Sequence, residues 1–395
     1  MSTFSELGVS ARVCEVLAKR NINEPFKIQG LVMEDAIAGK DVLAKSKTGS
    51  GKTLAFGIPI VEQVDPQGPR PVALILVPTR ELATQVTDEL SEVARARKLR
   101  IVPVYGGVSL PDQAKKASAA HIVVATPGRL QDLMDRRLLS MNAVQILVLD
   151  EADRMLDMGF RPQVDKILKR VPKERQTMFF SATLDGQVGQ LARAYTKDAV
   201  LHEVQSSIQT VDAANHNFVP VTQNEKVSKV VELVQEQAGT TLVFVRTKRG
   251  ADRLAYRLRK QGVEAVPMHA DLTQAARRKA LQQLASGKAQ VLVATDVAAR
   301  GLDLDNIEHV INFDPPGDHK DYVHRVGRTA RAGRSGTGTT LVLPDQQHEV
   351  SRMAARLQLD DEFEENGMVV APPQSVYRSH KGGRSMMRPR PKRRF

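Results

Sequence analysis

The sequence predicts an α/β protein with two domains, each a parallel β-sheet flanked by helices. The chain has 395 residues, which at about 150 residues per domain corresponds to two or three domains. Hydrophobic residues make up 42% of it and charged residues 26%, so it can form two cores, and disorder throughout is excluded. Short apolar segments alternate with longer segments of helical spacing. This alternation is typical of βαβ units.

The predicted strands are short segments rich in valine and isoleucine, which are too uniformly apolar for amphipathic helices. They are residues 72–77, 101–105, 122–125, 146–149 and 177–180 in the first half, and 242–245, 263–268, 291–294, 310–313 and 339–343 in the second. Segments with helical spacing lie between them and include residues 81–97, 226–237 and 274–286.

The alternation weakens once in the middle of the chain and stops near its end. We therefore expect a first domain at residues 1–205, a linker at 206–218 and a second domain at 219–360. An acidic patch and a segment rich in Pro, Gly, Ser and Arg follow. Such a composition predicts a disordered basic tail at residues 361–395.

The charge balance favours polyanionic partners, nucleic acid before membrane. The formal net charge is +12, and seven cations without an acid lie in the last fifteen residues. The single cysteine, Cys14, excludes an intramolecular disulfide and a cysteine-cluster metal site. No apolar run reaches the roughly 18 residues that a membrane span needs. We expect a cytoplasmic protein that does not bind membranes.

A glycine-containing loop follows the apolar segment that ends at Ala44. Its candidate nucleotide-binding residues are Ser46, Thr48, Gly49, Ser50, Gly51, Lys52 and Thr53. Strand, loop and helix together are the context of a phosphate-binding loop, in which Lys52 reaches the β- and γ-phosphates and Thr53 holds Mg²⁺. Ser46 stands where the strict motif has glycine. The alternative is an ordinary Gly/Ser-rich turn before a helix.

Acidic residues directly follow the apolar segment 146–149. Asp150, Glu151 and Asp153 would lie at the carboxyl end of a buried strand, where α/β sheets bind ligands. We assign Asp150 to Mg²⁺ and Glu151 to the attacking water. The alternative is a solvated acidic loop.

An arginine-rich segment in the second half has arginines at three-residue spacing, broken by glycines. Arginine binds phosphate in a bidentate manner and stabilises charge in phosphoryl transfer. Arg328 and Arg331 could act as arginine fingers if the segment faces the first domain's nucleotide. The alternative is a nucleic-acid-binding loop without a catalytic part.

Taken together, these motifs resemble the DEAD-box ATP-dependent RNA helicases of superfamily 2, from Phe4 to about Leu343. The blocks occur in the family's order: Pro78-Thr79-Arg80-Glu81-Leu82-Ala83, Gly106-Gly107, Thr126-Pro127-Gly128-Arg129, Asp150-Glu151-Ala152-Asp153, Ser181-Ala182-Thr183, Gln274-Ala275-Ala276-Arg277, the segment 294–303 and the arginine-rich segment. The short N-terminus and basic tail suggest a bacterial RhlE-like subgroup.

The resemblance implies two tandem RecA-like domains with ATP and Mg²⁺ in the cleft between them and RNA across both. It implies an RNA-dependent ATPase that unwinds or remodels RNA locally and non-processively. It also assigns residues 2–30 to the family's Q motif, with Gln29 at the adenine edge and Phe4 as its upstream aromatic. Ile22 stands where the family usually has an aromatic.

The other roles also come from the resemblance. The residues matched to second-domain nucleotide contacts are Gly301 and Asp303, and those matched to coupling between hydrolysis and closure are Asp153, Ser181, Thr183 and His324. The residues matched to RNA binding are Arg80, Gly107, Thr126, Arg129, Gln274, Arg277 and Thr295. These RNA-binding residues suit phosphate and sugar contacts and carry no base code, so binding should be independent of RNA sequence.

Three alternatives stay open at this point. The same ATP-hydrolysing motifs could act on DNA, the chain could be a non-enzymatic RNA clamp, or it could serve as a scaffold in an assembly. Intact Lys52, Glu151 and Arg328 argue against the clamp. Ribosomal and RNA-decay assemblies are the possible partners. The basic tail either adds salt-dependent RNA affinity or only increases solubility.

Overall fold

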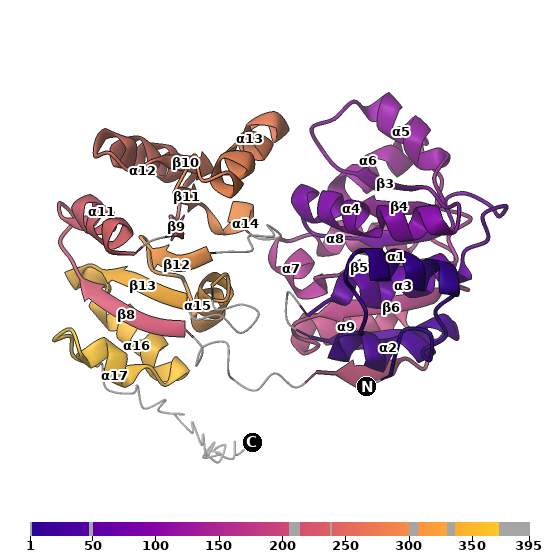
Figure 1. Ribbon diagram of the computed structural model, residues 1–395, viewed down its shortest axis with the longest axis horizontal. Coiled ribbons are helices and arrows are strands. Elements are labelled where there is room, and N and C mark those ends of the chain that lie inside the picture. Colours follow the sequence, from indigo (N-terminus) through magenta and orange to yellow (C-terminus); the bar gives the residue numbers. More distant parts are fainter. Residues whose placement is uncertain are drawn as a thin grey trace, which may run out of the picture.

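Two α/β domains lie side by side in the computed structural model (Figure 1). The structure describes residues 2–46, 50–204, 214–237, 239–299, 307–329 and 336–370. Each domain has a central parallel sheet with helices on both faces, as in the RecA-like fold. The predicted fold class is therefore confirmed.

The first domain contains a seven-stranded sheet in the order β3-β4-β2-β5-β6-β1-β7, with parallel pairing throughout. Its strands are β1 (Val42–Lys45), β2 (Ala73–Leu76), β3 (Ile101–Val104), β4 (Ile122–Ala125), β5 (Ile146–Asp150), β6 (Gln176–Ser181) and β7 (Val200–Glu203). Its helices are α1 (Ala11–Lys19), α2 (Lys27–Ile37), α3 (Lys52–Gln63), α4 (Arg80–Ala96), α5 (Leu110–Ser118), α6 (Pro127–Asp135), α7 (Ala152–Asp157), α8 (Arg161–Leu168) and α9 (Gly186–Tyr195).

The second domain contains a six-stranded parallel sheet in the order β10-β11-β9-β12-β13-β8. Its strands are β8 (Ala214–Pro220), β9 (Thr240–Phe244), β10 (Ala265–Met268), β11 (Val291–Ala294), β12 (Ile307–Asn312) and β13 (Gly336–Val342). Its helices are α11 (Lys226–Glu236), α12 (Lys248–Lys260), α13 (Gln274–Ala285), α14 (Asp296–Ala299), α15 (His319–Val326), the 3₁₀ turn η1 (Pro344–Gln346), α16 (Gln347–Leu357) and α17 (Asp360–Glu364).

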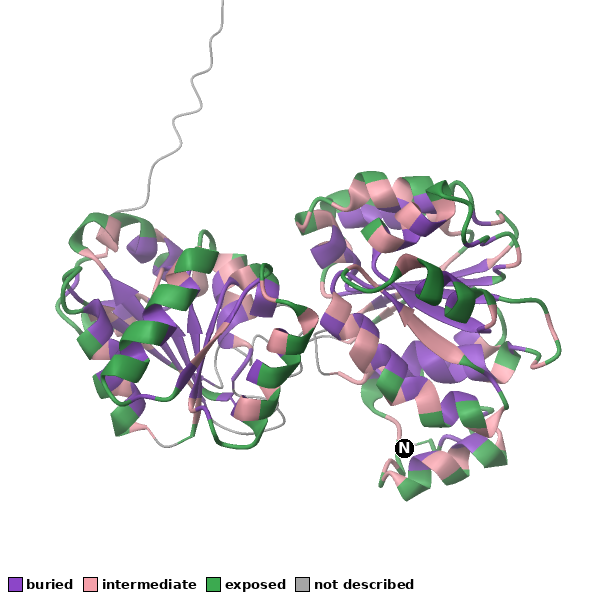
Figure 2. Ribbon diagram, turned by 90° about the horizontal axis from the view of Figure 1, so that it is seen from above, coloured by how far each residue is buried: buried purple, intermediate pink, exposed green. Residues whose placement is uncertain are grey.

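Both faces of the inner strands of the first sheet are buried, which explains why these strands are mostly apolar. Successive side chains of a strand point to opposite faces. Ile75 therefore packs in the cluster under α1 to α4, while its neighbour Leu74 packs in the cluster under α6 to α9. In Figure 2 most of the inner strands and inner helix faces are buried, and the outer helix faces are exposed or intermediate.

The predicted linker, residues 206–218, extends too far toward the C-terminus. β8 begins at Ala214, inside the segment expected to be linker, and pairs with β13 along its whole length. As an edge strand it buries alternate residues, including His216 and Phe218, and asparagines stand at positions 215 and 217 between them. It therefore lacks the continuous apolar run that identified the inner strands.

The predicted tail begins too early. Residues 360–364 form α17, and Phe363 is fully buried in a cluster with Tyr322 and Phe218. Met368 is buried in the same cluster. Acidic side chains in the first turn of a helix interact favourably with its dipole, so the acidic patch is compatible with structure. Residues 371–395, which hold most of the predicted tail, lie outside the described residues.

Most of the predicted functional residues that the structure describes lie at one edge of each sheet. In parallel sheets all strands end at the same edge, and the segments after β1 to β6 and after β10 to β12 carry the motifs. Among the described residues, no helix has the length and apolarity needed to cross a membrane.

Candidate nucleotide and RNA site

The phosphate-binding loop lies between β1 and α3. Lys52 is the first residue of α3, and Gly51 before it has φ of +83°, a conformation that favours glycine. The Lys52 ammonium is buried and donates to the carbonyl oxygen of Ser46 at 3.1 Å. The Ser50 hydroxyl donates to the hydroxyl oxygen of Ser46 at 3.0 Å. Thr53 lies in the same first turn. Thr48 and Gly49 are outside the described residues.

Gln29 joins α2 to this loop. Its amide Nε2 donates to the carbonyl of Gly51 at 2.9 Å, and its Oε1 accepts from the backbone N–H of Phe26 at 2.9 Å. A Cβ on Gly51 would lie 2.5 Å from the Phe26 ring and 2.6 Å from Gln29 Nε2, so no larger residue fits. Two motifs from separate parts of the sequence thus meet at one glycine.

Phe4 was predicted to contact the nucleotide, but the structure buries its side chain in the first domain. It is 3% exposed and belongs to the first domain's hydrophobic cluster, together with Leu7 and Val9. The turn at the start of the chain directs these apolar side chains inward, so the ring is not presented to a ligand.

The acidic motif lies where β5 ends. Burial raises the pKa of Asp150 to about 7, an effect that Lys52 opposes. Glu151 follows with φ of +51°, an unfavourable conformation for a residue with a side chain and one that recurs at functional sites. Its backbone N–H donates to Asp150 Oδ1 at 2.9 Å.

The Glu151 carboxylate is held by Arg154, a residue that the sequence reasoning missed. Arg154 Nη1 donates to both carboxylate oxygens, at 3.1 and 3.0 Å, and both side chains are nearly buried. The spacing of three residues at the start of α7 could have indicated this pair. The arginine fixes the direction of the carboxylate.

The predicted coupling residues of the first domain lie together. The Asp153 backbone N–H donates to Ser181 Oγ at 3.3 Å, and the Ala182 N–H donates to Asp153 Oδ2 at 3.2 Å. The Thr183 N–H also reaches Ser181 Oγ, at 3.4 Å. The ends of β5 and β6 are therefore linked, so a displacement of one loop acts on the other.

The arginine-rich segment begins in α15. Arg328 is buried, and Arg328 and His324 border one small depression with Phe244 and Asp296. Arg331, like Gly301 and Asp303, lies outside the described residues.

Arg325 anchors this segment, and the sequence reasoning did not single it out. Its Nε and Nη2 donate to the two carboxylate oxygens of Asp296 at 2.6 and 2.7 Å. Its Nη1 donates to Asn312 Oδ1 and to the carbonyl of Asp314. The regular arginine spacing gave no signal for this role, because Asp296 is distant in the sequence.

Four predicted RNA-binding residues of the first domain lie at the ends of β2, β3 and β4. The Arg80 guanidinium packs over the glycine pair: a Cβ on Gly107 would lie 2.7 Å from Arg80 Nη1. Arg129 Nη1 donates to the carbonyl of Val108 at 2.8 Å, beside the same glycines. Thr126 is the N-cap of α6, and its backbone N–H donates to the carbonyl of Val104.

The predicted RNA-binding residues of the second domain follow β10 and β11. Thr295 lies after β11, where its backbone N–H donates to the Met268 carbonyl at 3.2 Å. Gln274 begins α13, and its Oε1 is buried without a hydrogen-bond partner.

Arg277, in the same helix, contacts the first domain. Its Nε lies 2.9 Å from Oε1 of Glu81, the neighbour of Arg80. Both side chains are buried, and neither atom is aligned for a hydrogen bond, so the contact is an ion pair. It links the predicted RNA-binding residues of the two domains.

The side-chain oxygens near the nucleotide loop are suitable ligands for a magnesium ion. Mg²⁺ prefers hard oxygen ligands and is commonly held by one or two protein oxygens together with substrate phosphates. The Thr53 hydroxyl and the buried Asp150 carboxylate provide such oxygens. No cluster of three or more His, Cys, Asp and Glu side chains suited to a metal occurs among the described residues.

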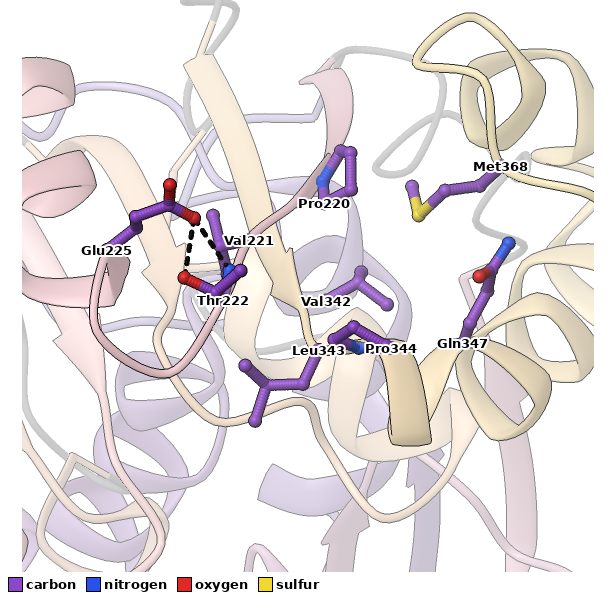
Figure 3. Close-up of a pocket in the computed structure, with 9 residues that line it drawn as sticks. All are labelled: Pro220, Val221, Thr222, Glu225, Val342, Leu343, Pro344, Gln347 and Met368. Carbon is purple, nitrogen blue, oxygen red and sulfur yellow. Dashed lines mark hydrogen bonds between the residues drawn. The ribbon is translucent and has the colours of Figure 1, made fainter.

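A cavity of about 240 Å³ lies away from these motifs, at the ends of β8 and β13 (Figure 3). Of the residues that line it, only Glu225 is ionisable, and its carboxylate accepts hydrogen bonds from the backbone N–H and hydroxyl of Thr222. Pro220, Leu343 and Met368 form apolar walls. The one ionisable side chain of the cavity is therefore engaged with a neighbouring residue of the lining.

Comparisons with known proteins agree with this geometry. The DEAD/DEAH box helicase family model matches residues 26–191, and that of the helicase conserved C-terminal domain matches residues 225–333. The DEAD-box ATP-dependent RNA helicase CshA of Geobacillus kaustophilus is 40% identical over 361 residues, which are 90% of this chain and 77% of that protein. The ATP-dependent rRNA helicase RRP3 of Yarrowia lipolytica is 43% identical over 344 residues, 86% of this chain and 72% of that protein.

Solved structures resemble both domains at once. Dbp5 of S. cerevisiae bound to RNA and ADP BeF3 superposes with a TM-score of 0.80 at 28% identity, covering 92% of this chain and 94% of that one. Mss116p bound to ssRNA and AMP-PNP has a TM-score of 0.79 at 26% identity, covering 90% and 78%. The chain belongs to the DEAD-box ATP-dependent RNA helicases.

Proposed function

We propose that the two domains close over ATP and one RNA strand, and that closure opens short duplexes locally rather than processively. The observation that carries this proposal is the Glu81–Arg277 ion pair, which joins the first turns of α4 and α13, the helices that begin with the predicted RNA-binding residues Arg80 and Gln274. Domains joined by a linker are mobile by default, so a buried pair between them favours one relative position. RNA bound to the predicted RNA-binding residues of both domains would favour the same relative position of the domains.

On the first domain, Lys52 would exchange its hydrogen bond with Ser46 for one with a phosphate oxygen of ATP. Thr53 and Asp150 would hold Mg²⁺, which neutralises charge on the phosphates. Glu151, directed by Arg154, would orient the attacking water. Gln29 would read the adenine edge beside Gly51.

The second domain would complete the reaction centre. Arg328 and Arg331 would stabilise charge that develops on the transferred phosphoryl group. Because Arg325 anchors this segment to Asp296, the segment should move with its domain as a unit. Hydrolysis would then require closure, and Asp153, Ser181 and Thr183 would report the state of the nucleotide to the neighbouring loops.

RNA would lie across Arg80, Gly107, Thr126 and Arg129 of the first domain and Gln274, Arg277 and Thr295 of the second. Dbp5 and Mss116p, which superpose on this chain, are bound to RNA together with nucleotide analogues. ATP and RNA would both stabilise the closed state. Each should therefore raise the affinity for the other by the same factor.

The test is ATP hydrolysis by the purified full chain, with RNA or DNA of equal length and sequence, together with unwinding of a short RNA duplex. We expect RNA to stimulate hydrolysis and DNA to stimulate it much less. Equal stimulation by DNA would instead support a DNA helicase. RNA binding without hydrolysis would support a clamp.

Ribosomal or RNA-decay assemblies are the partners that we propose, and the cytoplasm, which supplies both ATP and RNA, is the proposed location. The rRNA helicase RRP3 of Yarrowia lipolytica is 43% identical, which favours ribosomal RNA as a first substrate to test. Crosslinking in cells followed by sequencing of the bound RNA would identify the targets. An RhlE-like subgroup stays a prediction.

A further inference from the structure

We propose that Phe26 forms the stacking surface for the adenine base, a role that neither the motifs nor the resemblance assigns to it. The inference rests on the proposed function, because it concerns the same ATP site. It starts from one exposed aromatic ring. Phe26 is 62% exposed and lies in contact with the phosphate-binding loop.

The position of the ring is set by α2. Phe26 is the N-cap of this helix, with extended backbone angles and no side-chain hydrogen bond to the first turn. Ser, Thr, Asp or Asn at an N-cap stabilises a helix by about 1 kcal/mol relative to a residue that cannot accept a hydrogen bond. The chain forgoes that contribution here. Sequences break local rules of this kind mainly where function requires another side chain.

Packing alone does not explain the ring. Single exposed apolar side chains are common at protein surfaces and need no explanation by themselves. Phe26, however, approaches the loop so closely that a Cβ on Gly51 would lie 2.5 Å from its Cδ2 atom. One edge of the ring thus lies close to the loop, while most of its surface remains open to solvent.

The neighbouring polar group is suited to a base edge. Gln29 lies in the same corner, with Nε2 at 2.9 Å from the Gly51 carbonyl and Oε1 accepting from the Phe26 N–H. These two bonds fix the amide in one orientation. A purine that presents an edge to this amide can place its face on an adjacent ring.

The position at which the family usually has an aromatic cannot supply this surface. It holds Ile22, which is partly buried and packs against the first domain's core. An aliphatic side chain has no π face, and this one is engaged in the core. Phe26 therefore supplies, from the helix N-cap, the aromatic surface that Ile22 lacks.

Base–aromatic stacking contributes about 1–3 kcal/mol by alanine substitution, which corresponds to roughly 5- to 150-fold in affinity. The experiment uses the full chain and compares Phe26→Ala, Phe26→Leu and Phe26→Tyr. It measures the Kd of ATP by calorimetry and the inhibition of ATP hydrolysis by inorganic tripolyphosphate, which has no base. Tyr256→Ala, at another exposed aromatic on α12, is the matched control.

We expect Phe26→Ala and Phe26→Leu to weaken ATP binding about tenfold, and Phe26→Tyr to stay within twofold of the wild type. Tripolyphosphate inhibition should be the same in all three, and Tyr256→Ala should bind ATP like the wild type. The leucine variant keeps an apolar contact with Gly51, so a loss of ATP affinity in this variant reports the missing π face.

Three results would overturn the inference. They are unchanged ATP affinity in Phe26→Ala, wild-type affinity in Phe26→Leu, and an equal loss for ATP and tripolyphosphate, which would show that the ring only supports the loop. Failure of the proposed function gives a different result, because a wild-type chain that does not hydrolyse ATP would refute it whatever Phe26 does.

Discussion

Glu81 and Arg277 form a buried ion pair across the boundary between the two domains, with 2.9 Å between Oε1 and Nε. Arg277 was predicted from the family pattern to bind RNA, and from this contact we propose a second role for it, in domain closure. Removing one partner of a buried pair leaves the other charge desolvated, which costs up to about 3–5 kcal/mol. In a two-domain protein this cost is avoided if the domains separate, because the remaining charge is then exposed to water.

The first prediction follows from this pair. Arg277→Ala should raise the RNA concentration that half-maximally stimulates ATP hydrolysis by about 10- to 100-fold, because closure would desolvate Glu81 without a partner. The measurement is ATPase rate against RNA concentration. The exchanged variant, Glu81→Arg with Arg277→Glu, separates the two roles. Recovery there would indicate that the pair acts in closure, and no recovery would indicate direct RNA contact by Arg277.

The second prediction concerns the chemistry on the first domain. Lys52→Ala and Glu151→Gln should each reduce RNA-stimulated ATP hydrolysis by about 100-fold or more, since one loses the phosphate contact and the other the carboxylate that orients water. Glu151→Gln keeps the size of the side chain and can still accept a hydrogen bond from Arg154. Steady-state phosphate release is the measurement. Wild-type turnover in Glu151→Gln would refute the role assigned to Glu151.

The third prediction uses the contact between Gly107 and Arg80. Gly107→Ala should weaken RNA binding about tenfold, because the new Cβ would lie 2.7 Å from Arg80 Nη1 at a backbone φ of +87°. Gly262→Ala is the matched control: its φ is +82°, but no atom lies within 4 Å of the new Cβ. Fluorescence anisotropy with labelled RNA measures both. Similar losses in the two variants would mean that backbone strain, not Arg80, is responsible.

The fourth prediction concerns pH and the stability of the second domain. Burial lowers the pKa of His309 from 6.5 to about 4, and its Nε2 lies 2.8 Å from Thr339 Oγ1. Below pH 6.5 the unfolded chain binds a proton at this residue that the folded domain does not bind until about pH 4. The folded state should therefore lose up to about 3 kcal/mol from this residue as the pH falls through that window.

His309→Gln tests this origin of the acid sensitivity. Denaturant unfolding from pH 7 to pH 4 should show a smaller loss of stability in the variant than in the wild type. Equal slopes of unfolding free energy against pH in the two proteins would show that His309 is not the source.

The fifth prediction concerns the basic tail. Deletion of residues 371–395 should weaken RNA binding at low salt and reduce the dependence of log K on log salt by about 0.7 for each lost phosphate contact. The deletion starts after residue 370 because Met368 is buried in the core of the second domain. Replacing the tail cations by glutamine should reproduce the effect. Unchanged affinity and salt dependence would favour a solubilising tail.

The sequence by itself determined the parts of the protein that depend on local spacing. Apolar runs of four or five residues identified most inner strands, because a strand buried on both faces carries mainly apolar side chains. The phosphate-binding loop before Lys52 and the acids after β5 were identifiable for a similar reason. Their chemistry requires particular residues at fixed offsets within one short segment.

Only the tertiary structure decided the contacts between segments that are distant in the chain. Arg277 and Glu81, Arg325 and Asp296, and Phe26 and Gly51 are brought together by strand order and domain position, which no local pattern encodes. β8 and α17 were missed for the same reason. Their few apolar residues become significant only once the rest of the second domain supplies the surface on which they are buried.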